Sequence, residues 1–593
     1  MKDLVSSPEE TDNTPAVPAA AVPAPAATLP IPVPVSSIPE GFALFDDGIY
    51  EMPENDSAAP VFVCTPLRVD ASFSDTAGKG WGKVVAVRSR DGQWHDVPVL
   101  NRDLGCRSSD ILGQLLDHGL ELGRDKKSKE RLLALLRHWK PQSQMTSVTR
   151  MGWVPDGPAT FVIGNDVIGA RNVFPMLGSG AASTQSLRVS GSLESWRSEL
   201  GEKCRGNHMM LLAASLAFSG PLLALTGMSG GGLHFRGSSS SGKTTLMHLA
   251  ASVWGSRELI HQWRATSNGL EGVAVGMNDM LLAVDEIGEI APRALHEAIY
   301  MLANGTGKAR MNTDAVLKDT GRWRLALISS GEMSVEEKLK EAKLTAMAGQ
   351  EVRLIDIEAD GRAHGVFDDL HGAACAAEFA DSIKAATQIS HGAVGHEFIR
   401  MLVASKDHIS EIGTRYIRNF GAKAVSSLAR EPDGISHRVA QRFGLLALAG
   451  ELATMMKLTG WEKGEARSAA LGAFRDWHDR QFGDRIDQIS KVIQPMQNFL
   501  ATRIHELTDI GKDEPVGGGP GWKDDGHVYL KPETWLLLFP DPMTTAAAKA
   551  MLGLDMLLPG DGGRQMRKAP HAIPGRPRLY TVHRRRVMAF KSE

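Results

Sequence analysis

The sequence predicts an α/β core built on a parallel sheet, with an α+β domain before it and a helical region and a small C-terminal module after it. Three observations predict the core. A glycine-rich loop joins a strand-like segment, GGLHFR, to a helix-like one, TTLMHLAASVW. Two more apolar strand-like segments, MLLAVDEIG and WRLALISSGE, end in polar residues. Helix-like segments separate these strands, and such alternation is typical of parallel sheets.

The composition is that of a globular protein of several domains. The 593 residues are 42% hydrophobic and 23% charged, with a net charge of −3, so a basic surface for nucleic acid has to be local. The four cysteines form no C-x-x-C pair, which indicates reduced thiols and neither a zinc site nor disulfides. The uncharged run Met209–Met228 contains Ser-Gly-Pro, which favours a buried helix over a membrane span. We expect a cytoplasmic protein with no membrane contact.

The N-terminal part divides into an arm and a domain. We expect residues 1–40 to be a disordered Pro/Ala-rich arm, because prolines interrupt its apolar stretch and no basic segment begins a secretory signal. Residues 41–200 predict an α+β accessory domain, with strand-like VFVCTPLRV and helix-like KSKERLLALLRHW. Some of its basic and aromatic residues either contact nucleic acid or pack in the ordinary way: Arg137, Trp139, Lys140, Arg150 and Trp153.

Three parts make up the rest of the chain. Residues 203–365 form the predicted core, and residues 366–510 have an almost wholly helical pattern. Residues 511–593 combine a strand, a helix and a basic hairpin-like end, an order that suits a winged-helix-like module. The basic end, with His583 before Arg584, Arg585 and Arg586, suits contact with a duplex backbone; the alternative is a solubilising tail.

The glycine-rich loop carries the motif G-x-x-x-x-G-K-[ST] without interruption. Small residues let backbone N–H groups surround phosphates, and the N-terminus of the following helix favours their negative charge. Lys243 is expected to reach the β- and γ-phosphate oxygens, and the Thr244 hydroxyl to ligate Mg²⁺. The predicted ATP-binding residues are Gly237, Ser238, Ser239, Ser240, Ser241, Gly242, Lys243, Thr244 and Thr245.

The next two strand-like segments end in candidate catalytic residues. We expect Asp285 to hold Mg²⁺ through water and Glu286 to be the general base for the attacking water; the alternative is an acidic turn. The following segment ends in Ser329 and Ser330. One of them, with Ser330 preferred, is expected to orient that water, although a serine pair is also ordinary turn chemistry. Together with the loop, these residues predict an ATPase.

A basic segment, GKARMNTDAVLKDTG, lies between these two strands. We expect a hairpin that points Lys308, Arg310 and Lys318 at the phosphates of one nucleic-acid strand in the channel of a ring. The alternative is a solvated charged loop. Upstream, Trp263 is expected to be buried in the core, with the channel or a subunit interface as alternatives.

The motif spacing and the basic insert resemble the superfamily 3 and MCM-like hexameric helicases among the AAA+ ATPases. A longer set of segments resembles the mobile-element ATPases of the domain of unknown function 927 (DUF927) family, closely over residues 145–365: FRGSSSSGKTT, WRATSNGLEGVA, LLAVDEIGE, YMLANGTGKAR and GQEVRL. The resemblance implies an α/β P-loop AAA+ ATPase core that uses ATP and Mg²⁺. It also implies a replicative helicase of a mobile genetic element.

The resemblance further implies that Arg353 acts as an arginine finger, reaching the γ-phosphate held by the neighbouring subunit. About twenty residues separate it from Ser330, more than in the superfamily 3 pattern, so other arginines compete for the role: Arg310, Arg322 and Arg324. The structural alternative is that Arg353 pairs with Glu351 or Asp356.

We therefore expect an ATP-dependent DNA helicase or translocase that acts as a ring, a hexamer, in the replication of a mobile element. One DNA strand would lie in the central channel, and duplex DNA at the C-terminal module. Two alternatives stay open: a non-helicase DNA-binding ATPase switch of the initiator, loader or partition type, and a regulatory or defence ATPase that acts on protein partners. The segment DIEAD at 356–360 has no second carboxylate set to form a metal site, so we expect an acidic loop there.

Overall fold

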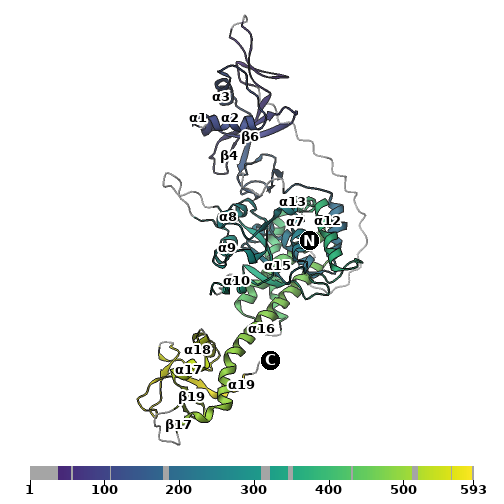
Figure 1. The fold of residues 1–593 in the computed structure, drawn as a ribbon. Coiled ribbons are helices and arrows are strands. Elements are labelled where there is room, and N and C mark those ends of the chain that lie inside the picture. The colour runs from purple at the N-terminus through teal and green to yellow at the C-terminus, as the bar shows by residue number, and fades with distance from the viewer. Residues whose placement is uncertain are drawn as a thin grey trace. The chain divides into compact units, whose positions relative to one another are not determined.

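The structure is a computed structural model that describes residues 38–54, 58–106, 108–177, 186–308, 321–344, 352–428, 432–510, 519–541, 543–561 and 564–590. The chain divides into two compact units, Met1–Phe474 and Arg475–Glu593 (Figure 1). Residues 1–37, most of the predicted arm, lie outside the described residues. Within the described ranges, no helix is both long and apolar enough to cross a membrane.

In its described residues, the first part of the N-terminal unit contains three sheets and three α-helices. Antiparallel strands β1 (Phe42–Phe45), β2 (Gly48–Glu51) and β3 (Val61–Cys64) form one sheet. A five-stranded sheet has the order β11-β7-β4-β5-β6, with bounds Val173–Pro175, Gln144–Val148, Leu67–Ser74, Gly82–Arg88 and Trp94–Leu100. The third sheet holds β8 (Gly152–Trp153), β9 (Phe161–Ile163) and β10 (Asp166–Ile168). The helices are α1 (Asn101–Cys106), α2 (Ser108–Asp117) and α3 (Ser128–His138).

Two tryptophans of this part pack in the interior. Trp139 is buried with Leu132 and Leu135 of α3 in the core beneath the five-stranded sheet. Trp153 is also buried, and its ring N–H donates to the Pro221 carbonyl at 2.8 Å. For these two residues the ordinary-packing alternative holds, because neither presents a ring face for stacking on a base.

A five-stranded parallel sheet forms the centre of the N-terminal unit, with the order β13-β14-β15-β12-β16. The strands are β12 (Gly231–Arg236), β13 (Ile260–Gln262), β14 (Met280–Asp285), β15 (Leu325–Gly331) and β16 (Leu354–Glu358). β12, β14 and β15 are buried along nearly their whole length, as expected of strands covered on both faces. Because all the strands are parallel, their ends define a carboxyl edge and an amino edge of the sheet.

Helices cover both faces of this central sheet. α5 (His208–Ser219) and α7 (Lys243–Ser252) pack on β14 and β15 from one side. On the other side α8 (Ser267–Gly276) and α9 (Pro292–Asn304) share a core with these strands, and Figure 1 shows α8, α9 and α10 (Val335–Lys340) along that face. α5 is buried from Met209 to Ser219, so its lack of a polar face follows from its position inside the unit.

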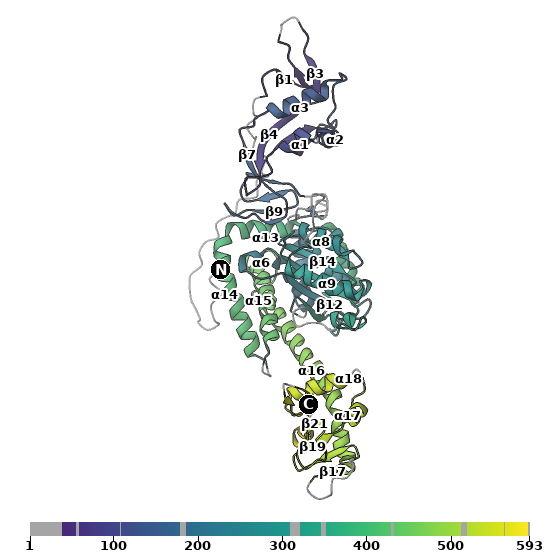
Figure 2. The same cartoon turned by 90° about the vertical axis from the view of Figure 1, so that its left-hand side faces the viewer.

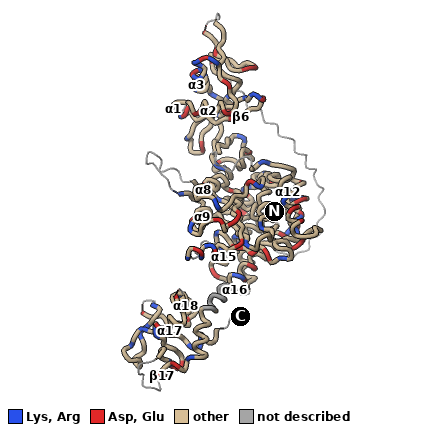
Figure 3. The backbone as a smooth tube through the Cα atoms, viewed as in Figure 1, with Lys and Arg blue, Asp and Glu red and all other residues tan. Residues whose placement is uncertain are grey.

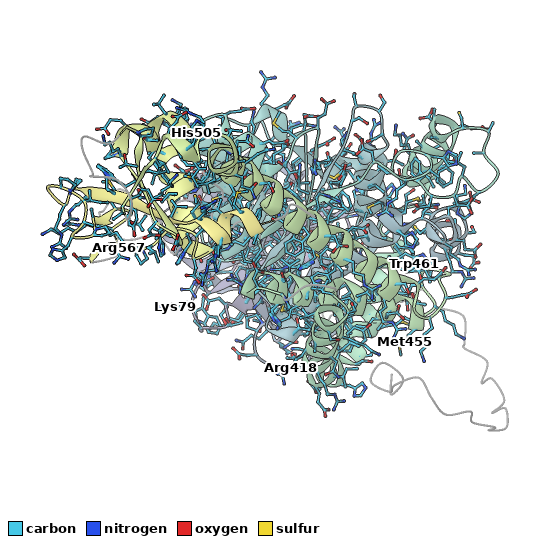
Figure 4. The ribbon with its side chains drawn as sticks, turned by 90° about the horizontal axis from the view of Figure 1, so that it is seen from below. Lys79, Arg418, Met455, Trp461, His505 and Arg567 are labelled. Carbon is cyan, nitrogen blue, oxygen red and sulfur yellow. The ribbon has the colours of Figure 1, made fainter. Side chains whose placement is uncertain are left out.

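The rest of this unit is helical. Its elements are α4 (Leu193–Trp196), α6 (Leu222–Thr226), α12 (Ala376–Ile389), α13 (Ala393–Ala404), α14 (Lys406–Ser426), α15 (Gly434–Met455) and the start of α16 (Glu465–Thr502). α14 and α15 lie side by side (Figure 2), and α15 packs on α5. Buried Arg442 of α15 donates to the carbonyls of Ser229 and Gly230, at 2.7 and 2.9 Å, and so ties the helices to the start of β12. Trp461, labelled in Figure 4, donates its ring N–H to the Gly201 carbonyl.

In its described residues, the C-terminal unit combines the part of α16 from residue 475 to 502 with a small sheet and three further helices. The sheet has the order β17-β18-β19-β21-β20, with bounds Thr508–Asp509, Gly521–Lys523, His527–Leu530, Arg578–His583 and Arg567–Lys568. The helices are α17 (Pro532–Leu538), α18 (Met543–Gly553) and α19 (Arg584–Ala589). Trp535 stacks on Tyr580 in the core, with ring centroids 4.2 Å apart. Exposed cations, marked blue in Figure 3, lie on and around β20, β21 and α19: Arg564, Arg567, Lys568, Arg578, Arg584, Arg585 and Arg586.

Candidate nucleotide-binding site

The glycine-rich loop, Gly237–Gly242, connects the end of β12 to the start of α7 at the carboxyl edge of the sheet. Two residues in it adopt left-handed backbone conformations, Ser240 with φ of 60° and Gly242 with φ of 105°. A Cβ atom at Gly242 would lie 2.7 Å from Val366 Cγ2, so this position requires glycine for space as well as for its φ. The sequence thus permits a tight turn that leads directly into a helix N-terminus, where an anion is favoured.

Lys243 lies inside this loop. Its side chain is largely buried, and its ammonium donates to the carbonyls of Gly237 at 2.9 Å and Ser238 at 2.6 Å. The next residue, Thr244, is exposed, whereas Thr245 is buried in the core. The first turn of α7 therefore presents one ammonium and one hydroxyl at the loop, and the Thr245 side chain faces the interior.

Asp285 and Glu286 lie at the same edge, at the end of β14. Asp285 Oδ1 accepts hydrogen bonds from the Ser330 hydroxyl and, at 3.0 Å, from the Glu286 backbone N–H. Both bonds that described residues donate to this carboxylate fall on Oδ1, so Oδ2 can accept from a metal-bound water. Glu286 has φ of 60° and ψ of 73°, a left-handed conformation that costs energy for a residue with a side chain. Such strain is common at functional sites.

The two predicted sensor serines face opposite ways, as neighbours on a strand must. Ser330 bonds Asp285, which places its hydroxyl among the candidate catalytic groups. Ser329 is fully buried, and its hydroxyl lies 2.8 Å from Trp263 Nε1 and 2.9 Å from His234 Nδ1. Of the pair, Ser330 lies beside the Asp285 carboxylate, and Ser329 belongs to a buried network.

The hydrogen bonds of this network form a chain in which each group donates to the next, from Trp263 through Ser329 and His234 to the Met333 carbonyl. His234 Nε2 lies 2.9 Å from the Met333 carbonyl, which can only accept, so Nε2 carries the proton and Nδ1 accepts from Ser329. Ser329 in turn accepts from the Trp263 ring N–H. Burial lowers the pKa of His234 to about 4, which keeps the ring neutral as this chain of bonds requires. The Trp263 backbone N–H donates to the Asp285 carbonyl at 3.0 Å, so the network supports the carboxylate strand.

Sequence patterns did not identify His234 as part of the site, and they predicted Trp263 as a core residue, with the channel or a subunit interface as alternatives. The pairing of β12 with β15 brings His234 opposite Ser329, and these positions are far apart in the sequence. A buried histidine within an otherwise apolar strand next to the loop is the one signal that could have drawn attention to this network.

Asp356 of β16 lies at the end of the same polar layer. It accepts from the Val335 backbone N–H at 3.2 Å and lies 4.0 Å from His234 Nε2. Burial raises the pKa of this carboxyl to about 7.

Asp356→Asn is expected to change how stability depends on pH. In the wild type the unfolded chain loses this proton near pH 3.8 while the folded chain keeps it to about pH 7, so folded-state stability falls as pH rises through that window. Asparagine keeps the bond to Val335 and does not titrate. Relative to wild type, the free energy of unfolding of the variant should rise by about 2–3 kcal/mol as the pH goes from 5 to 8, measured by denaturant titration. An equal pH profile for both proteins would contradict a buried, protonated Asp356.

The flanks of the basic segment that carries the predicted DNA-contacting residues lie at the amino edge of the sheet. The isolated bridge between Thr306 and Arg322, with the Gly307 N–H bonded to the Gly321 carbonyl, pairs the two flanks of the basic segment in antiparallel fashion. Arg310 and Lys318 lie outside the described residues. Lys308 is exposed and lies 3.4 Å from Glu297. These flanks lead into the start of β15, at the edge opposite the glycine-rich loop.

Arg353 also lies at the amino edge, directly before β16. Its carbonyl accepts from the Gly232 N–H at 2.8 Å, and its guanidinium lies over the Tyr300 ring at 4.9 Å. Within one chain it is therefore separated from the loop by the length of β12. Of its described competitors, Arg322 is exposed, and Arg324 forms an ion pair with Asp279 at 2.9 Å.

Asp279 joins three segments at this edge. Its side chain is fully buried and accepts from Arg324 Nε and from the Trp153 backbone N–H, at 2.9 and 3.1 Å. Next to it, Asn278 donates to the Met151 carbonyl at 2.8 Å and accepts from the Arg324 N–H at 3.0 Å. Gly152, with φ of 98°, permits this contact, because a Cβ atom there would lie 2.4 Å from Asp279 Oδ2. The turn before β14 thus holds both β15 and the β8 segment.

Comparison with known proteins identifies a family over part of the chain and a similar fold. Residues 42–322 match the model of the family described as Domain of unknown function (DUF927), which confirms the predicted resemblance over a region that begins and ends earlier than the motifs indicated. The solved structure of the SCCmec type IV Cch active helicase matches with a TM-score of 0.65 and 19% identity, covering 93% of this chain and 99% of that one. This likeness shows a shared fold of mixed sheets and helices. A search of curated proteins found no match.

Proposed function

We propose that this chain, which carries a DUF927 domain at residues 42–322, is an ATP-dependent DNA helicase or translocase built on an α/β P-loop AAA+ core. The observation that supports this most strongly is the meeting of Lys243, Asp285 and Ser330 at one edge of a parallel sheet. A loop that surrounds an ammonium beside a strand-end carboxylate is suited to a metal-bound triphosphate. The fold shared with an active helicase supports the same class of activity.

ATP and Mg²⁺ fit the residues of this edge. The glycine-rich loop and the N-terminus of α7 would hold the phosphates, with Lys243 moving from loop carbonyls to phosphate oxygens. The exposed Thr244 hydroxyl and Asp285 Oδ2 are oxygen donors of the kind Mg²⁺ prefers. When bound, the metal supplies positive charge that stabilises the phosphate oxygens. Glu286 would accept the proton of the attacking water, and Ser330 would fix the carboxylate beside it.

DNA would be bound away from the nucleotide. Lys308, at the amino edge, would contact the phosphates of one strand together with Arg310 and Lys318, and the exposed cations of the C-terminal unit suit a duplex backbone. We propose a hexameric ring in which Arg353 reaches the nucleotide of the next subunit. Its position outside its own chain's phosphate site is compatible with that role. The process served would be replication of a mobile element, in the cytoplasm.

Replacing Lys308, Arg310 and Lys318 by alanine is expected to uncouple DNA from ATP hydrolysis. The DNA-stimulated part of the rate should fall by about tenfold or more and fork unwinding should be lost, while the rate without DNA stays within about twofold. Because three phosphate contacts are removed, the slope of log affinity against log salt should become shallower by about 2–3. The measurements are ATPase rates with and without single-stranded DNA, unwinding of a fork, and salt titrations of DNA binding.

The matched control removes three exposed cations from α14: Arg415, Arg418 and Lys423. Arg418 is labelled in Figure 4. Equal losses in both triple variants would indicate a general effect of charge and contradict the assigned contacts. If DNA stimulated hydrolysis by the wild type but no unwinding occurred, the DNA-binding ATPase switch would be favoured. If DNA did not change the rate of hydrolysis, an ATPase that acts on protein partners would be favoured.

A further inference from the structure

Residues 359–367, here called the strap, cross the glycine-rich loop after β16. The Ala359 N–H donates to the Arg236 carbonyl at 2.8 Å, at the start of the loop. The Val366 N–H donates to the Ser241 carbonyl at 2.9 Å, near its end. The strap therefore contacts both limbs of a loop that lies more than a hundred residues earlier in the chain. Sequence patterns indicated no more than an acidic loop here.

Asp360 makes the contact between these two points. Its Oδ2 accepts from the Ser238 backbone N–H at 2.5 Å and from the Ser238 hydroxyl at 2.7 Å. Gly237 allows the approach, because a Cβ atom there would lie 2.7 Å from Asp360 Cγ. Burial acts to raise the pKa of Asp360, but the bonds from Ser238 and the charge of Lys243 outweigh it and lower the pKa, so the group is ionised at neutral pH.

The peptide group between Gly237 and Ser238 separates Asp360 from Lys243. Its carbonyl accepts from the Lys243 ammonium at 2.9 Å, and its N–H donates to Asp360. In a trans peptide the carbonyl and the N–H point in opposite directions. Asp360 therefore lies on the far side of this peptide from the ammonium, and its carboxylate does not compete for the place where Lys243 would meet phosphate.

We propose that Asp360 is a positioning residue for nucleotide binding. It fixes the orientation of the Gly237–Ser238 peptide, so that the carbonyl faces Lys243 and the first limb of the loop is ordered before nucleotide arrives. The inference rests on the proposed ATPase function. Without this anchor the loop has to be ordered during binding, which weakens affinity more than it slows the chemical step.

The test compares Asp360→Ala and Asp360→Asn with wild type in full-length protein. Binding is titrated with a fluorescent ATP analogue, and KM and kcat are measured by steady-state hydrolysis. Asp360→Ala should raise Kd and KM by about tenfold and change kcat by less than about threefold. Asp360→Asn should stay within about threefold in KM, because the amide oxygen accepts the same N–H. Glu358→Ala is the control, since it removes a charge two residues earlier that pairs with Arg236 at 3.5 Å.

Three results would overturn the proposal: unchanged KM in Asp360→Ala, tighter binding in that variant, or a loss confined to kcat. Should Asp360→Ala fail to fold, Ser238→Ala removes one of the two hydrogen bonds to Asp360 and should raise KM by about threefold. An unchanged KM in Ser238→Ala would count equally against the positioning role of Asp360. Wild-type protein that binds no ATP analogue would instead contradict the proposed function, so the two failures are distinguishable.

Discussion

Glu286→Gln is expected to slow ATP hydrolysis by about 100-fold or more while ATP binding stays within about threefold of wild type. Glutamine keeps the shape of the side chain in its left-handed turn but cannot accept the proton of the attacking water. The loop, Lys243 and Asp285 are untouched, so the affinity for nucleotide should persist. Single-turnover hydrolysis at saturating ATP measures the rate of hydrolysis, and titration with a fluorescent ATP analogue measures the affinity for nucleotide.

Glu289→Gln serves as the matched control for Glu286→Gln. Glu289 is exposed, three residues further on, and its replacement makes the same chemical change outside the site. Its hydrolysis rate should equal that of wild type. If Glu286→Gln kept more than a tenth of the wild-type rate, Glu286 would not be the general base, and the acidic-turn alternative for this segment would gain support.

Asp279→Ala is expected to lower the free energy of unfolding of the N-terminal unit by about 2–4 kcal/mol. The substitution leaves the Arg324 guanidinium without its carboxylate and the buried Trp153 N–H without an acceptor. It also opens a space beside Gly152, where the backbone approaches the carboxylate closely. Denaturant unfolding followed by tryptophan fluorescence gives the change, because Trp153 lies at the affected contact.

The control for Asp279→Ala is Glu297→Ala, which removes an exposed carboxylate that pairs with Lys308. A surface pair of this kind contributes about 0–1 kcal/mol, so this variant should unfold nearly as wild type does. If Asp279→Ala lowered the free energy of unfolding by less than about 1 kcal/mol, the contact of β8 and β15 with the turn before β14 would be stabilised by the apolar core alone.

The candidate site was predictable from sequence where its residues are close together in the chain. The loop and the first turn of α7 follow from one contiguous motif, because a glycine-rich turn before a helix N-terminus has few other uses. Asp285 and Ser330 were predictable as strand-end residues, since parallel strands bring their carboxyl ends to one edge. The sequence preferred Ser330 over Ser329 without a geometric reason, and the structure supplies one, because the two side chains point in opposite directions and only Ser330 bonds Asp285.

Contacts between distant segments were not predictable in this way. Nothing in the spacing of DIEAD indicates that Asp360 bonds Ser238, because that contact depends on β16 pairing with β12. The same holds for His234 with Ser329, and for Asp279 with Trp153. Trp139 and Trp153 illustrate the converse, since local composition allowed a surface role and only the tertiary core excluded it.

The order of strands in the central sheet determines which fragments of this protein can be expressed. β12 is bordered by β15 and β16, and both strands come after residue 322. A fragment cut to the family match, residues 42–322, would contain the glycine-rich loop but neither strand that pairs with β12. The backbone N–H and C=O groups of β12 would then be unpaired and form an open sheet edge, which promotes aggregation. During synthesis, too, β12 can acquire both of its neighbouring strands only after residue 358 has been made, more than a hundred residues after the loop itself.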